Sequence, residues 1–82
     1  MSNAAAATHA VLYRSGRPIR VAAVTDWQAL ADMRSAASMS IGIYIVAEVD
    51  ARTARDAEDT IAGARSARAV MASPAWQAAL AA

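Results

Sequence analysis

The sequence contains no cysteine, no phenylalanine and a single histidine, His9. Disulfide bonds and thiolate metal sites are therefore excluded, and one imidazole without companions at ligand spacing does not predict a metal centre. The three glycines, Gly16, Gly42 and Gly63, lie too far apart to form a loop that cradles phosphate. The longest mainly apolar run covers about ten residues, which is too short to cross a bilayer.

Large apolar side chains are also scarce. Leucine, isoleucine and valine together contribute 14 of the 82 residues, whereas alanine alone contributes 25. A small domain with so few large apolar groups needs close backbone packing, a partner, or both. We therefore expect a self-associating protein, with a homodimer as the simplest form.

Carboxylates are the only candidate acid–base groups present in number, and they cluster between residues 48 and 59. Arg52 and Arg55 are interleaved with them at the four-residue spacing of ion pairs on a helix surface. The cluster is therefore better explained as a helix start and a charged surface than as a catalytic pair. Because no nucleophile or nucleotide-binding motif accompanies it, we predict that the protein is not an enzyme and uses no cofactor and no metal.

The net charge is only +1, but the charges are segregated along the chain. Residues 1–25 carry three arginines and no acid. Residues 60–82 carry Arg65 and Arg68 and no acid. The acidic groups of residues 48–59 lie between these two basic parts. This arrangement suits head-to-tail attraction or a mixed-charge binding face. An ordinary solvated surface is the alternative.

Two short runs rich in β-branched residues predict a hairpin. Residues 9–14 and 18–25 are typical of strands, and residues 15–17 form a short turn between them. A three-residue loop would place Val11 opposite Val21 and Tyr13 opposite Ile19 on one face of the hairpin, whereas a two-residue loop would flip one strand relative to the other.

The strongest strand signal is the stretch 39–49, in which apolar residues alternate with others and three isoleucines share one face. We expect this stretch to be the central strand of the sheet. Gly42 in its middle would weaken the strand unless another group packs closely there.

Three helices follow from capping signals. A capping box starting at Thr25 predicts a helix to about residue 37, with Trp27 on its inner face. Asp50 is the expected N-cap of a second helix that reaches residue 71 or 72, and Ser73 before Pro74 is typical of the start of a short third helix.

These elements in the order ββαβα, followed by the short C-terminal helix, predict an α+β fold. We expect a three-stranded antiparallel sheet with the helices on one face. Residues 8–82 would form this single small domain, and residues 1–7 are expected to be a disordered tail or a tag remnant.

Two sets of residues are candidates for binding. An aromatic residue among arginines on the hairpin could contact an acidic protein surface or a phosphate backbone, although a solvated hairpin tip is equally consistent. The candidate partner-binding residues are Tyr13, Arg14, Arg17 and Arg20. A C-terminal helix too short to be stable alone must dock on the domain or on another subunit. The candidate self-association residues are Arg68, Met71, Trp76 and Leu80.

The size, the ββαβα layout, the arginine- and alanine-rich composition and the absence of catalytic groups resemble the small anti-CRISPR proteins of phages and prophage-like elements, particularly those of the type I class. The resemblance covers the whole chain and includes no motif, so no functional residue is carried over. It implies a stoichiometric inhibitor that binds a type I surveillance complex in the host cytoplasm and blocks target-DNA recognition. The net charge of +1 argues against DNA mimicry, so we expect the inhibitor to cover a protein surface.

Two alternatives belong to other classes. One is an assembly module of a phage or a toxin system, whose main activity is self-association. The other is a small nucleic-acid binder that uses the arginine-rich hairpin, for which affinity would fall steeply with salt.

Overall fold

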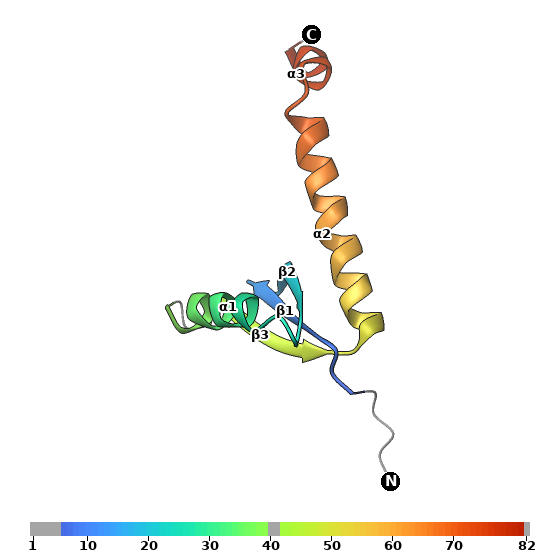
Figure 1. Cartoon of the computed structure of the whole chain (residues 1–82). Coiled ribbons are helices and arrows are strands. Elements are labelled where there is room, and N and C mark those ends of the chain that lie inside the picture. The colour runs from blue at the N-terminus through green and yellow to red at the C-terminus, as the bar shows by residue number, and fades with distance from the viewer. Residues whose placement is uncertain (1–5, 40–41, 82) are drawn as a thin grey trace.

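The computed structural model describes residues 6–39 and 42–81 of the chain (Figure 1). Three strands and three helices follow in the order ββαβαα, and the strands form one antiparallel sheet. The predicted α+β class and element order are therefore confirmed. The elements are β1 (His9–Arg14), β2 (Arg17–Ala23), α1 (Trp27–Met39), β3 (Tyr44–Val49), α2 (Ala51–Met71) and α3 (Pro74–Ala81). Most of the tail expected at residues 1–7 lies outside the described residues, and its last two alanines are exposed and without regular structure.

β1 and β2 form the predicted hairpin, but the connection is tighter than expected. Only Ser15 and Gly16 separate the strands, and both have positive φ angles, of 50° and 81°. Positive φ at both central positions is the geometry of the two-residue turns that match the twist of a hairpin. The register is irregular next to Tyr13, which pairs with Pro18, so the pairing expected between Tyr13 and Ile19 is wrong. Ile19 is left as the extra residue of a β-bulge.

The strand order is β2-β1-β3, so the central strand is β1 and not the stretch 39–49. Met39 is the last residue of α1, and β3 begins only at Tyr44. Gly42, with φ of 84°, lies in a turn that leads into β3. This left-handed conformation suits glycine, and the turn interrupts the strand that the alternating pattern predicts. Ser40 and Ile41 of the expected strand lie outside the described residues.

α1 covers one face of the sheet through a small apolar cluster. Leu30 and Met33 of the helix pack with Ala10 and Leu12 of β1, and all four side chains are buried. Trp27 does not belong to the inner face as predicted, because 72% of its surface is exposed.

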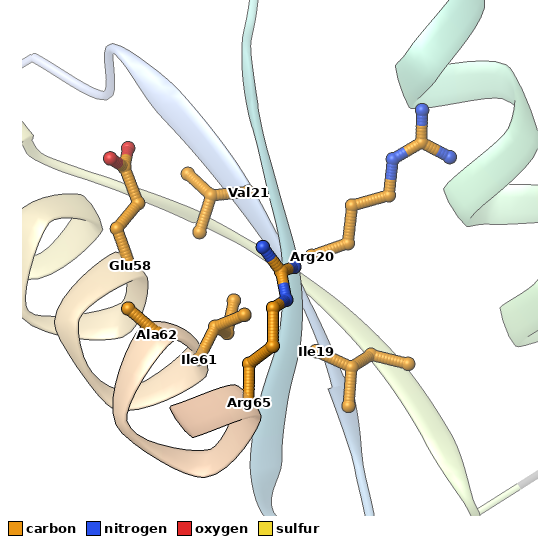
Figure 2. A pocket seen from close by; sticks show the side chains of 7 residues that line it. All are labelled: Ile19, Arg20, Val21, Glu58, Ile61, Ala62 and Arg65. Atoms are coloured by element: carbon orange, nitrogen blue, oxygen red, sulfur yellow. The ribbon is translucent and has the colours of Figure 1, made fainter. Parts of the chain in front are cut away.

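α2 covers the opposite face, so the expectation that the helices share one face is wrong. Val11 is completely buried outside the α1 cluster, and Ala54 and Ala57 of α2 are buried too. Figure 2 shows α2 on one side of β2, with Val21, the strand partner of Val11, pointing toward it. The physical reason is that the central strand carries apolar residues on both faces, and successive side chains of a strand alternate between them. Each face therefore needs a cover.

Side chains cap the N-termini of the helices. Asp26 Oδ1 accepts a hydrogen bond from the Ala29 N–H at 3.1 Å, so α1 is capped one residue later than the box expected at Thr25. Asp50 and Ser73 accept the corresponding bonds at the starts of α2 and α3, as predicted.

The second half of α2 extends away from the sheet and carries α3 at its far end (Figure 1). The described part of the chain measures 60 × 30 × 21 Å, and its radius of gyration is 16.3 Å. A compact domain of this length would have a radius of gyration of about 12 Å. From residue 62 to residue 81 every residue is exposed except Ser73, which is half-buried. We call residues 66–81 the arm.

Candidate functional site

The three arginines of the hairpin lie on one face of the sheet. Arg14 is paired with Arg17 across the two strands, and Arg20 is paired with Leu12. Directly paired residues share a face, and Leu12 and Arg14 are two positions apart, so all three arginines project from the face that α1 covers. All three are exposed. We call Arg14, Arg17 and Arg20 the arginine face.

The structure separates Tyr13 from these arginines and brings Tyr44 to them. Tyr13 is half-buried on the opposite face, where it pairs with Pro18 and Ile45. Tyr44 of β3 pairs with Arg14, whose guanidinium carbon lies 5.8 Å from the centre of the tyrosine ring. This distance is typical of a cation–π contact. Sequence reasoning missed Tyr44, because nothing in the pattern shows that β3 pairs with β1.

A groove of about 310 Å³ lies between β2 and α2 (Figure 2). Its floor is apolar, and charged side chains stand along α2 at its edge. The residues that line it are Ile19, Arg20, Val21, Glu58, Ile61, Ala62 and Arg65. The side chain of Arg20 extends away from α2, toward the side of the sheet where α1 lies, so Glu58 and Arg65 are the charged groups on the α2 side of the groove. Sequence reasoning did not find this groove, since it depends on which strand α2 crosses.

Glu58 and Arg65 have no ionic partner within the described residues. There, the one ion pair joins Arg34 to Glu48 at 3.9 Å, with both side chains exposed. Glu58 and Arg65 are seven residues apart on α2, which is two helical turns or about 10 Å. They therefore stand at different heights along the same groove.

The arm carries all four residues that the sequence marked for self-association. Arg68 and Met71 lie in the last turn of α2, and Trp76 and Leu80 lie on α3. All four are exposed, with 41% of the Trp76 surface and 66% of the Leu80 surface accessible. Val70 is also exposed. Few bonds hold α3 on α2; one of them runs from Gln77 Nε2 to the Met71 carbonyl oxygen at 2.7 Å.

Potential metal-ligating side chains of the described ranges, residues 6–39 and 42–81, do not cluster. No group of three or more potential ligand side chains lies close enough to hold a metal ion there. His9 Nδ1 lies 2.7 Å from the Thr8 hydroxyl at the start of β1. The hydrogen bond from the Thr53 N–H lowers the pKa of the Asp50 carboxyl below its usual value. This shift reflects helix capping.

Comparison with known proteins adds no relative. A scan against protein-family models gave no match, and neither did searches of curated proteins and of solved structures. Among the helices described, none combines the length and the hydrophobicity needed to span a bilayer.

Proposed function

We propose that this protein is a non-enzymatic protein-binding module and that the arm is its binding element. The observation that carries the proposal is the exposure of large apolar side chains on the end of α2 and on α3, which project from the body of the protein. Val70, Met71, Trp76 and Leu80 account for four of the exposed large apolar residues of the described chain. Tryptophan is among the residue types that most often dominate the binding energy of an interface.

The arm is also poorly stabilised within its own chain. α3 has eight residues and no buried side chain, and an isolated helix of that length is marginal in water. Burial of apolar surface contributes roughly 25 cal/mol per Å², so docking of these side chains on a partner would stabilise both the complex and the arm. A partner surface therefore supplies what the domain lacks.

The specific form of this proposal is a stoichiometric inhibitor that binds a type I CRISPR surveillance complex and covers the surface that recognises target DNA. Its support is the resemblance in size, layout and composition to small anti-CRISPR proteins, together with the exposed arm. An assembly module that binds only further copies of itself is the alternative form. The two forms differ in the partner and share the arm.

The experiment compares two matched tryptophan substitutions. Trp76→Ala removes the arm residue, whereas Trp27→Ala removes an exposed tryptophan of α1 at a distance from the arm. We expect the tagged protein to capture an assembled type I surveillance complex and to abolish its target-DNA binding, with capture lost for Trp76→Ala and retained for Trp27→Ala. If the wild type captures the complex and both variants capture it equally well, the role of the arm is contradicted.

Capture of no complex would contradict the inhibitor form. In that case, sedimentation velocity of the same variants decides on the module form, since we expect Trp76→Ala but not Trp27→Ala to remove the assembly that depends on the arm. A wild-type protein that is monomeric at all concentrations and binds no complex would contradict the proposal as a whole.

A second candidate function is nucleic-acid binding, and the arginine face favours it. Three exposed arginines on one face, with Tyr44 beside Arg14, combine the charges that bind phosphates and the ring on which a base can stack. Binding to DNA or RNA oligonucleotides should weaken steeply between 50 mM and 200 mM salt if this candidate is right. A flat salt response, or no binding at low salt, would exclude it.

A further inference from the structure

We propose that the groove between β2 and α2 binds the α2 helix of a second copy of this chain, in antiparallel orientation about a two-fold axis. The inference shares with the proposed function only the premise that the protein binds proteins. The charged groups that the test reverses, Glu58 and Arg65, line the groove and precede the arm, so their variants leave the apolar side chains of the arm unchanged. The groove thus adds a defined partner, a second copy, to the binding surface already described.

The α2 side of the groove forms one stripe of the helix. Glu58, Ile61, Ala62 and Arg65 have the spacing of i, i+3, i+4 and i+7, which places them on one face of a helix. This face borders the apolar floor that Val21 and the half-exposed Ile19 provide. A helix laid in the groove would therefore contact both α2 and β2.

The stripe is complementary to itself when two copies run antiparallel. A two-fold axis between Ile61 and Ala62 places residue 58 of one helix opposite residue 65 of the other. Glu58 of each copy then meets Arg65 of the second copy, so the interface has two identical ion pairs. Such an isologous contact is the commonest kind in symmetric dimers. Both charges lack an ionic partner within the described part of a single chain, and the second copy supplies one.

The size of the neighbouring residues permits close contact. Ala51, Ala62 and Ala69 continue the stripe along α2, and all three are exposed. Small side chains at the contact allow helix axes to approach to about 8 Å. Close contact is therefore possible at these alanines, between the larger side chains of Glu58, Ile61 and Arg65 on the same face of α2.

The charges of the wider chain agree with the antiparallel orientation. Residues 48–59 carry five carboxylates against two arginines, whereas residues 60–82 carry two arginines and no acid. The proposed axis places the acidic start of each α2 beside the basic end of the other. A parallel pair would instead bring like charges together, and charge patterns of this kind select orientation.

The test is a charge-exchange series measured by sedimentation velocity on the full chain. Glu58→Arg alone, or Arg65→Glu alone, would place like charges opposite each other at two symmetric sites. We expect each single reversal to raise the dimer dissociation constant by about tenfold. The double variant Glu58→Arg/Arg65→Glu restores opposite charges, and its constant should return to within about threefold of the wild-type value.

The matched control is Asp59→Arg, which makes the same charge change one residue away. Asp59 is not among the residues that line the groove, so this variant should dimerise like the wild type. All substituted residues are exposed, so circular dichroism should show folded protein in every case. A parallel measurement with Trp76→Ala should leave the groove-mediated dimer intact.

Loss in the single reversals with recovery in the double variant supports the groove. If neither single reversal changes the dimer dissociation constant but Trp76→Ala abolishes the dimer, the proposed groove interface is wrong and the arm is the binding element. If the double variant dimerises as weakly as the single variants, the antiparallel pairing of Glu58 with Arg65 is wrong. A wild-type chain that stays monomeric overturns the second copy as the occupant, whatever the arm binds.

Discussion

Arg17 and Arg20 project from the same face of β2 although three positions separate them. In a regular strand this spacing would send them to opposite faces. The bulge next to Tyr13 and Ile19 inserts one extra residue and restores the match, because Arg17 pairs with Arg14 while Arg20 pairs with Leu12. The irregularity of β2 therefore creates the arginine face.

The arginine face should be separable from the stability of the fold. Because Arg14, Arg17 and Arg20 are all exposed, we expect their combined reversal to glutamate to leave a folded protein. The melting temperature should change by only a few degrees, since surface substitutions usually change stability by less than about 0.5 kcal/mol each. If the face binds nucleic acid or a protein partner, the folded variant should lose that affinity. Unchanged affinity in a folded variant would remove the arginine face from the binding surface.

The α1 cluster should depend on one methionine. Met33 is 1% exposed and packs among Ala10, Leu12 and Leu30, so Met33→Ala should cost about 2–5 kcal/mol of stability. Met39, at the end of the same helix, is 82% exposed, and Met39→Ala is the matched control. Urea unfolding followed by circular dichroism measures both. Equal effects of the two substitutions would contradict the placement of α1 on the sheet.

Substitution of two glycines by alanine should change the stability of the protein in opposite directions. Gly42 has φ of 84°, where an alanine is strained, so Gly42→Ala should destabilise by about 1 kcal/mol. Gly63 lies inside α2 with open space around its Cα, so Gly63→Ala should stabilise the helix by up to about 1 kcal/mol. Thermal unfolding of both variants gives the two signs. A stabilising effect at Gly42 would contradict the turn before β3.

The cap of α2 should make stability depend on pH. Asp50 Oδ1 accepts the Thr53 N–H at 2.8 Å, and this bond lowers the pKa of the carboxyl in the folded state. Its contribution is therefore present above the unfolded pKa of about 4 and disappears as the pH falls through the lower folded value. Asp50→Ala should be less stable than the wild type at pH 7, with the difference vanishing in acid. In Asp50→Asn, the amide oxygen can cap the helix and does not titrate. This variant should therefore be more stable than Asp50→Ala both at pH 7 and in acid.

The local features of this fold could be predicted from the sequence, and the long-range ones could not. The turn at Gly16 and the caps at Asp50 and Ser73 depend on residues within a few positions, so their signals are complete in the sequence. The alternating pattern of residues 39–49, by contrast, does not contain all the information that decides their structure. A period of two shows that residues share a face, but it does not show which strand lies beside them or where a preceding helix ends.

The same limit applies to the length of the face that α2 buries. Small residues recur at helical spacing through Ala64 and Ala67, which predicts one continuous inner face. Only the first part is covered, because α2 has 21 residues while β2 has seven, and the helix continues where the sheet has ended. The groove and the arm both arise from this difference in length, which no local pattern contains.

If the arm binds a partner as proposed, it also links the lifetime of the protein to that partner. Protease cleavage needs a locally unfolded segment, and helical segments with few buried contacts open most easily. Arg68 lies in the exposed arm, so trypsin-like enzymes would cut there first and release the apolar end of the chain. A bound partner stabilises the folded arm by mass action. Unpartnered copies would therefore be truncated and inactivated while engaged copies persist, which matches the amount of intact protein to the amount of its target.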